Sequence, residues 1–199
     1  MSLPPIHPIE AESYRILAER VDLSAWTPRA RAVVARVIHA AADVGYADTL
    51  VVEEAACDAG IAALRSRAPV VADVDMVAVA TRRAGTVSLL AEGRERAEPG
   101  VTVSAAAMRV AAERWPSGAV VVVGNAPTAL REVVALATAG RFAPALVIGL
   151  PVGFVGATEA KAELRASGLP AISNVGERGG SAVAAAALNA LWRLSREDG

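Results

Sequence analysis

Two side chains suited to acid–base chemistry, Ser13 and His39, lie on two helices predicted near the N-terminus. The first helix is expected from Ile9 to about Arg20, and Ser13 falls on its apolar stripe. The hydroxyl there either bonds a backbone carbonyl one turn back or faces a ligand. The second helix is expected to start at the N-cap Thr27 and to run to about Val44, with His39 flanking its apolar face. Because imidazole titrates near neutrality, a ring at such a border could exchange a proton with a ligand in a pocket.

Three glycine-rich turns each connect a predicted strand to a predicted helix. They span Gly124–Pro127, Gly149–Gly156 and Gly176–Ser181, and Asn125 is expected to cap the helix that follows the first turn. Ligands of open parallel sheets collect at the carboxyl ends of the strands. Free N–H groups at a helix N-terminus can bind a carboxylate or a phosphate. We therefore expect three anion-binding turns on one edge of the sheet.

Several common sites are not indicated by the sequence. None of the three turns matches the G-x-G-x-x-G or phosphate-loop patterns, and no carboxylate follows Gly124 by about 20 residues, which disfavours a nucleotide-binding fold. The G-x-S-x-G pattern of a nucleophilic serine is missing. His7, His39 and Cys57 have no metal-ligand spacing, so no metal site is predicted.

Other polar or reactive residues have a structural as well as a functional interpretation. Asp73 and Asp75 flank the end of a strand, where a capping role and a functional role are equally plausible. Cys57 is expected to be a small buried hydrophobe rather than a nucleophile. Glu159 and Lys161 lie two residues apart on a predicted helix, so they do not face each other and are expected to be solvated.

The elements around these residues alternate between strand and helix, which is typical of a three-layer α/β/α fold. Continuous apolar runs such as residues 119–123 predict strands buried on both faces, in a mainly parallel sheet of about five strands. We expect one domain over residues 1–199, with residues 1–8 extended. The candidate strands are 49–52, 69–74, 86–90, 119–123, 145–149 and 171–175, and the later helices are 54–65, 104–115, 128–139, 157–167 and 181–195.

Composition excludes several classes of protein. With 54% hydrophobic and 21% charged residues in 199, the chain can bury a large core, unlike a disordered chain, a membrane protein or a disulfide scaffold. A net charge of −1 provides no basic surface for nucleic acid or anionic lipid. Of the 20 basic residues 19 are arginines, a bias explained by genomic composition or by anion recognition. A single cysteine and an N-terminus without a signal-peptide pattern predict a cytoplasmic protein.

Four motifs, in order along the chain, resemble the precorrin-8X methylmutase (precorrin isomerase) family. The resemblance extends from about Ile9 to Leu191. The motifs are Arg36-Val37-Ile38-His39-Ala40, Gly124-Asn125-Ala126-Pro127-Thr128-Ala129-Leu130, Pro151-Val152-Gly153-Phe154-Val155-Gly156-Ala157 with Glu159 and Lys161, and Arg178-Gly179-Gly180-Ser181 with Asn189-Ala190-Leu191.

The resemblance implies a cofactor-free isomerase of cobalamin biosynthesis. Such an enzyme moves a methyl group from C-11 to C-12 of precorrin-8X, giving hydrogenobyrinic acid, and its anaerobic-route counterpart acts on cobalt-precorrin-8. The family implies a cytoplasmic homodimer with tetrapyrrole sites near the subunit interface and His39 as catalytic acid. The expected substrate contacts are Ser13, Tyr14, Asp73, Thr102, Ser104, Asn125, Ala126, Pro127, Gly153, Phe154, Gly179, Gly180 and Ser181.

The chain departs from the family pattern at two places. Val103 stands where the family is expected to have an arginine, and a glycine expected near Val79 is missing. Arg82, Arg83 or Arg109 could replace the lost cation. Two hypotheses follow: an active methylmutase with His39 as its acid, or a relative that binds a corrinoid without turnover.

Overall fold

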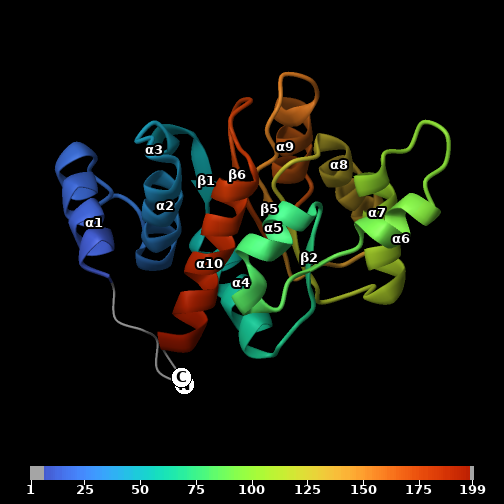
Figure 1. Cartoon of the computed structure of the whole chain (residues 1–199), viewed down its shortest axis with the longest axis horizontal. Helices are drawn as coiled ribbons and strands as arrows, with labels where there is room; N and C mark the ends of the chain where they lie inside the picture. Colours follow the sequence, from blue (N-terminus) through green and yellow to red (C-terminus); the bar gives the residue numbers. More distant parts are fainter. Residues whose placement is uncertain (1–6, 198–199) are drawn as a thin grey trace.

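A six-stranded sheet forms the middle layer of the computed structural model, which describes residues 7–197 (Figure 1). The strand order is β1-β6-β5-β4-β2-β3. All neighbouring pairs are parallel except β1 with β6 at the edge. The strands are β1 (Leu50–Val52), β2 (Val70–Ala72), β3 (Val87–Ser88), β4 (Val120–Val123), β5 (Leu146–Gly149) and β6 (Ala171–Asn174).

Helices cover both faces of this sheet. The helical elements are α1 (Pro8–Arg20), α2 (Pro28–Ala41), α3 (Tyr46–Thr49), α4 (Glu54–Arg65), α5 (Asp75–Ala80), the 3-10 turn η1 (Arg82–Ala84), α6 (Leu90–Glu95), α7 (Val103–Arg114), α8 (Pro127–Thr138), α9 (Ala157–Ala166) and α10 (Ser181–Glu197). Helices α1, α2, α4, α5 and α10 contribute to one hydrophobic core, and α7, α8 and α9 to the other. No helix within residues 7–197 is long and apolar enough to cross a membrane.

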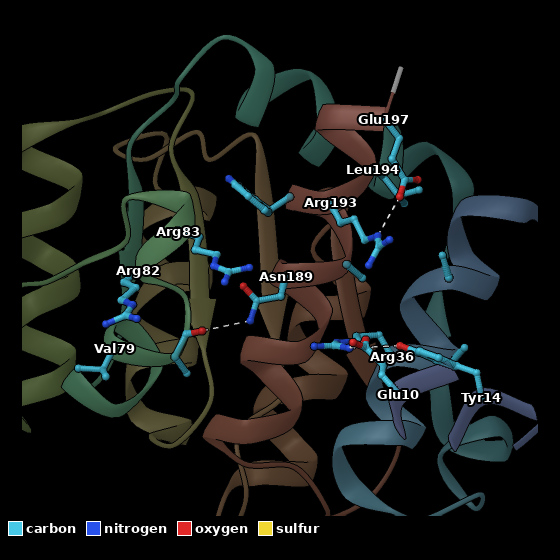
Figure 2. Close-up of a pocket in the computed structure, with 15 residues that line it drawn as sticks. Glu10, Tyr14, Arg36, Val79, Arg82, Arg83, Asn189, Arg193, Leu194 and Glu197 are labelled. Atoms are coloured by element: carbon cyan, nitrogen blue, oxygen red, sulfur yellow. Dashed lines mark hydrogen bonds and ion pairs between the residues drawn. The ribbon is translucent and has the colours of Figure 1, made fainter. Parts of the chain in front are cut away.

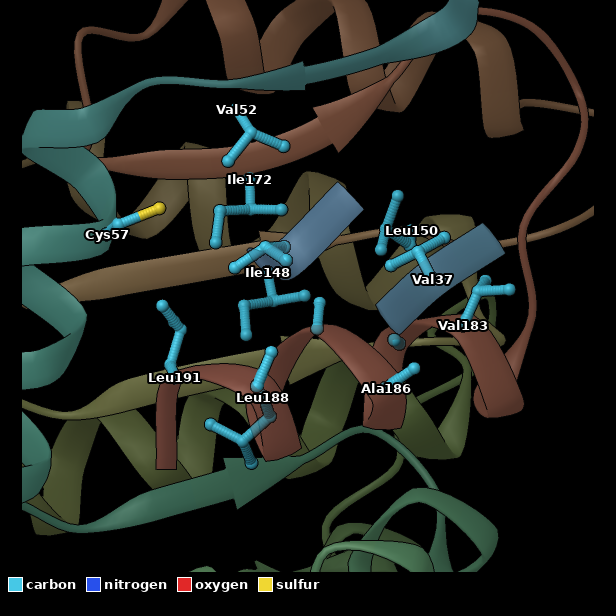
Figure 3. Close-up of a cluster of buried hydrophobic side chains, with 14 of the residues drawn as sticks. Val37, Val52, Cys57, Ile148, Leu150, Ile172, Val183, Ala186, Leu188 and Leu191 are labelled. Atoms are coloured by element: carbon cyan, nitrogen blue, oxygen red, sulfur yellow. The ribbon is translucent and has the colours of Figure 1, made fainter. Parts of the chain in front are cut away.

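The side chains of β4 divide between these two cores. Val120 and Val122 belong to the α2/α4/α10 side, whereas Val121 and Val123 belong to the α7/α8/α9 side. All four are buried, as a strand covered on both faces requires. Figure 3 shows the first core, where Val37 of α2 and Leu188 of α10 pack over Ile148 of β5. The predicted three-layer α/β/α class is confirmed, and all six candidate strands are present in a sheet for which about five were expected.

Some expected boundaries are wrong for local reasons. Helix α2 ends at Ala41 and not near Val44, because Ala42 adopts a left-handed conformation with φ 52°. The expected strand 86–90 is reduced to Val87–Ser88, since α6 begins at Leu90. The short elements α3, α5, η1 and α6 were not predicted. Of the expected extended segment 1–8, residues 1–6 lie outside the described part of the chain, and Pro8 already opens α1.

Glu54, and not Thr27, caps the helix that bears His39. The Thr27 side chain makes no capping bond to α2 and instead donates its hydroxyl to Glu54. The Glu54 carboxylate accepts the backbone N–H groups of Arg29 and Ala30 at 3.3 and 3.1 Å. A carboxylate at a helix N-terminus also interacts favourably with the positive end of the helix dipole. Helix α2 is therefore fixed at its start by the first residue of α4.

Candidate active site

His39 forms a polar cluster with two residues of α1. The Ser13 hydroxyl oxygen lies 2.8 Å from His39 Nδ1. The Tyr14 ring stacks on the imidazole, with centroids 5.1 Å apart and 19° between the planes. All three side chains are partly buried. The structure thus brings together three of the residues expected at the site, and the Ser13 hydroxyl is directed at the imidazole.

The hydrogen bond at Nδ1 determines which nitrogen of His39 is available to a ligand. Either atom can be the donor in this bond; when the serine hydroxyl donates to Nδ1, the neutral imidazole carries its proton on Nε2. His39 Nε2 forms no hydrogen bond with another residue of the described chain. Nε2 is therefore the nitrogen that remains for a ligand, and it can give a proton when the Ser13 hydroxyl is the donor to Nδ1.

Tyr14 is itself held in place by an ion pair between the same two helices. Arg36 of α2 pairs with Glu10 of α1 and donates a hydrogen bond to the Tyr14 hydroxyl at 3.3 Å. Burial lowers the pKa of Arg36, but the bond to Tyr14 and the Glu10 carboxylate outweigh it and raise the pKa above its usual value. The guanidinium therefore stays charged. The ion pair and its hydrogen bond fix the face on which the imidazole stacks.

A cavity of about 620 Å³ opens beside this cluster (Figure 2). Tyr14 and Arg36 line one wall, α10 provides Asn189 and Arg193, and η1 provides Arg82 and Arg83. A volume of this size is within the range of small-molecule sites. Neither His39 nor Ser13 lines this cavity; Tyr14, which stacks on the imidazole, is the member of the cluster that does. The sequence analysis did not foresee this cavity, because its walls come from four segments far apart in the chain.

Asp73 organises the first glycine-rich turn instead of facing solvent. Its carboxylate is fully buried and accepts the backbone N–H groups of Gly124, Asn125 and Ala126 at 3.0, 2.8 and 2.8 Å. Burial raises the pKa of the Asp73 carboxyl, and these N–H donors oppose the rise. As a direct substrate contact the prediction for Asp73 is wrong in this structure, since no surface of the residue is accessible. The expected cap by Asn125 is also wrong: Asp73 binds the N–H groups that precede Pro127.

The second and third glycine-rich turns are bonded to each other. Gly180 N–H donates to Leu150 O at 2.9 Å, and Gly153 N–H donates to Glu177 O at 3.2 Å. A Cβ on Gly179 would lie 2.4 Å from the carbonyl oxygens of Leu150 and Pro151, so only glycine permits this approach. All three turns follow parallel neighbouring strands, β4, β5 and β6, and so lie on one edge of the sheet, as expected.

The residues expected to contact substrate at these turns differ in exposure. Asn125 and Phe154 are exposed, the latter at 92%. The remaining six are partly exposed: Ala126, Pro127, Gly153, Gly179, Gly180 and Ser181. All of them can therefore be reached by a ligand or a partner, unlike Asp73.

Lys161 is buried, and the expectation that it is solvated is wrong. Its ammonium donates to Asn174 Oδ1 at 3.0 Å and to Arg178 O at 2.8 Å, which ties α9 to the third turn. Burial lowers the pKa of Lys161 to about 8, and nearby Arg165 lowers it further while Glu177 opposes. The helical spacing from Ala157 to Leu164, both fully buried, places Lys161 on the buried face and could have revealed this. Glu159 is exposed, as expected.

Thr102 and Ser104 lie far from His39 within one chain. They stand at the start of α7, which covers the opposite face of the sheet, and Figure 1 places α7 and α2 toward opposite ends of the long axis. The Thr102 hydroxyl caps α7 through Ala105 N–H at 3.2 Å and bonds the Thr128 hydroxyl at 2.8 Å. One chain therefore does not bring these two residues to the imidazole.

Two other sequence expectations are resolved by their surroundings. Arg109 bonds Glu132 at 2.8 Å and pairs with Glu98 at 3.3 Å, so it is occupied and does not replace a cation at Val103. Cys57 is fully buried, and burial raises the pKa of its thiol to about 12, which confirms the small buried hydrophobe.

Within residues 7–197, no three His, Cys, Asp or Glu side chains gather as a metal site would require.

Comparison with known proteins gives one consistent result. The family model described as precorrin-8X methylmutase matches residues 8–194. A cobalt-precorrin-8 methylmutase from Priestia megaterium is 38% identical over 196 residues, covering 94% of this chain and 87% of that protein. A precorrin-8X methylmutase from Pseudomonas aeruginosa is 38% identical over 193 residues, covering 92% and 93%. The crystal structure of precorrin-8X methyl mutase from Thermus thermophilus superposes with a TM-score of 0.88 at 39% identity, covering 96% and 97%.

Proposed function

The chain belongs to the precorrin-8X methylmutase family, and we propose that it moves the methyl group of precorrin-8X from C-11 to C-12 to give hydrogenobyrinic acid. Methylmutase function, an isomerase activity of cobalamin biosynthesis, follows from the family. The observation that supports the reaction at this site is the Ser13–His39–Tyr14 cluster, in which Tyr14 also lines the cavity. Cobalt-precorrin-8 is the second candidate substrate, since relatives of either name are equally similar to the chain.

His39 acts as the acid in this proposal. A methyl shift within one molecule needs a fixed conformation and a placed proton. Nε2 gives its proton to the macrocycle, which draws electron density from C-12, so that the methyl bond to C-11 breaks as the bond to C-12 forms. Because substrate and product are isomers, the proton returns to His39 once the methyl group has moved. Ser13 holds Nδ1 at 2.8 Å and Tyr14 covers one face of the ring, so the imidazole is oriented before the substrate binds. No step of this scheme uses a cofactor or a metal.

The carboxylates of the tetrapyrrole periphery are expected to contact the edge of the sheet. The N–H groups of Gly124, Asn125, Ala126, Gly153 and Gly180 are bonded within the protein, so the donors that remain there for anionic groups include the Asn125 amide and the Ser181 hydroxyl. The exposed Asn125 and the partly exposed Gly179, Gly180 and Ser181 provide this surface. Asp73 and Lys161 support this surface without contacting the substrate, since they hold the first and third turns in place.

We infer that the protein works as a homodimer in which two chains share each site. Thr102 and Ser104 of one chain are distant from its own His39, so a partner must supply them if they bind substrate. Phe154 and Val155 are 92% and 89% exposed, an apolar tip that a second chain would cover. Sedimentation velocity tests the dimer. Mixed dimers of a His39→Ala chain and a Ser104→Trp chain should regain activity above either variant alone, whereas no recovery contradicts a shared site.

The cytoplasm is the proposed location. The single cysteine, Cys57, cannot form an internal disulfide, and its buried thiol has a raised pKa. The fold therefore does not depend on a disulfide that only an oxidising compartment would maintain.

The test of the function is turnover of each substrate by the same preparation. Purified protein is incubated without oxygen with precorrin-8X or with cobalt-precorrin-8, and the visible spectrum is followed. We expect conversion of precorrin-8X with the higher kcat/KM. Tight binding of hydrogenobyrinic acid without conversion of either substrate would instead indicate a corrinoid-binding relative, the alternative raised by Val103.

A further inference from the structure

The cavity beside His39 holds more positive than negative charge. Four arginines and two glutamates line it. Glu10 pairs with Arg36, and Glu197 pairs with Arg193 at 2.8 Å. Both carboxylates are therefore already matched by a guanidinium. Two arginines remain, so the cavity has a local excess of positive charge although the whole chain has a net charge of −1.

The two remaining arginines are Arg82 and Arg83 of η1. Both are exposed, and neither guanidinium forms an ion pair or a hydrogen bond with any residue from 7 to 197. In Figure 2 the Arg83 side chain extends toward Asn189 of α10, and Arg82 lies beside Val79. Both arginines line the side of the cavity opposite Tyr14 and Arg36, and in Figure 2 the Arg83 guanidinium is directed toward Asn189 while that of Arg82 points away from it. A ligand that fills the cavity from Tyr14 would reach Arg83 at its other side.

The backbone that bears these arginines is anchored on both sides. Thr81, fully buried, donates its hydroxyl to Val77 O at 2.6 Å. Asn189 Nδ2 donates to Ala80 O at 3.1 Å, which ties the end of α5 to α10. Thr86 donates to Thr81 O at 3.2 Å. The turn is therefore positioned in advance, and a ligand would have to order only the arginine side chains.

We propose that Arg83, assisted by Arg82, binds carboxylates at the periphery of the tetrapyrrole and so helps to determine substrate specificity. A guanidinium presents paired N–H donors that match both oxygens of a carboxylate. A volume of about 620 Å³ suits a ligand larger than a simple acid, and Tyr14 and Arg83 line opposite walls of the cavity. This assignment rests on the proposed function, since the tetrapyrrole supplies the carboxylates.

The test compares charge-neutral variants with a matched control. Arg83→Gln, Arg82→Gln and the double variant are compared with Arg94→Gln, which removes an exposed arginine that has no partner in residues 7–197 and lies on α6 beyond the other face of the sheet. KM and kcat for precorrin-8X, and Kd for hydrogenobyrinic acid, are measured at two salt concentrations. We expect Arg83→Gln to raise KM and Kd about tenfold, as loss of a hydrogen bond to a charged group does, with kcat changed less than twofold. Arg82→Gln should have a smaller effect, and the double variant should show a weaker salt dependence.

Each outcome bears on the proposal. If wild type converts the substrate and the double variant keeps the KM of Arg94→Gln, the carboxylate site is wrong while the function stands. If the variants alter the sedimentation coefficient but neither KM nor Kd, the arginines bind carboxylates of a partner chain. That result also overturns the proposed carboxylate site. If wild type binds hydrogenobyrinic acid without turnover and Arg83→Gln weakens that binding, the site is supported and the methylmutase reaction is not. A wild-type protein that binds neither substrate nor product overturns both.

Discussion

Replacing Asp73 with asparagine should loosen the first glycine-rich turn without altering the shape of the side chain. Gly124 N–H is bonded to Oδ1, whereas the N–H groups of Asn125 and Ala126 both point at Oδ2. The carboxamide of the variant can turn so that its oxygen still accepts from Asn125 and Ala126, but its NH2 group then faces the N–H of Gly124, which loses its acceptor. The turn would then be held less firmly to β2, and the start of α8 with it.

The magnitude follows from one lost bond and from the loss of charge at the other two. At about 2 kcal/mol for the lost bond to a charged group and about 0.5 kcal/mol for each bond that becomes neutral, the loss is about 3 kcal/mol. Removing a buried charge offsets roughly 1 kcal/mol of this, which leaves a net loss of about 2 kcal/mol. For a protein of this length, the melting temperature should fall by about 4–8 °C.

Thermal unfolding followed by circular dichroism measures this change, with Asp75→Asn as the matched control. Asp75 is two residues away, exposed, and forms no ion pair or side-chain hydrogen bond with the rest of the described chain. We expect Asp75→Asn to melt within about 1 °C of wild type, as surface changes usually do. A raised KM for Asp73→Asn with an unchanged melting temperature would refute the reasoning, because it would make Asp73 a substrate contact after all.

Three further changes test the site and its supports. Ser13→Ala removes the bond at His39 Nδ1, worth about 0.5–1.5 kcal/mol, so kcat should fall about two- to thirteenfold at unchanged melting temperature; an unaltered kcat would show that the bond does not orient the ring. Gly179→Ala forces the second and third turns apart, because its Cβ would lie 2.4 Å from two carbonyl oxygens, and should cost about 1–3 kcal/mol by urea unfolding, with Ser181→Ala as the milder control. Lys161→Met tests the buried ammonium through pH: the folded pKa is about 8 and the unfolded one near 10.5, so between these values the unfolded chain binds a proton that the folded chain has released. The contribution of Lys161 to the free energy of unfolding should therefore rise from pH 8 to pH 10.5 in wild type. Urea midpoints measured over this pH range should show the rise in wild type and not in Lys161→Met. If the midpoints of both proteins change equally with pH, the lowered pKa of the buried ammonium is contradicted.

The fold was predictable because its strongest signals are local. The valine run of β4 and the helix bounds Glu54–Arg65 follow directly from apolar runs and spacing. The exact ends of the helices and strands, and the short elements, could not be predicted, because they depend on tertiary contacts. Helix α2 starts where Glu54 of another helix accepts its N–H groups, a partner 24 residues away that no local pattern around Thr27 reveals.

The site was predictable where a polar residue interrupts an apolar pattern. Ser13 on its stripe and His39 at its border did meet, at 2.8 Å. Asp73 and Lys161 were misjudged because burial decides their roles, and burial depends on how separate elements pack. The cavity wall formed by Arg83 and Asn189 joins η1 to α10, so its charge could not be read from either segment alone.

The most direct test is the conversion of precorrin-8X by wild type and by His39→Ala in parallel, without oxygen, followed by the visible spectrum of the product. Circular dichroism of both proteins verifies that the fold is kept. We predict conversion by wild type and a loss of about 10²–10⁴-fold in His39→Ala, the usual contribution of a placed acid. Near-normal turnover by a folded His39→Ala protein would contradict the assignment of the proton donor.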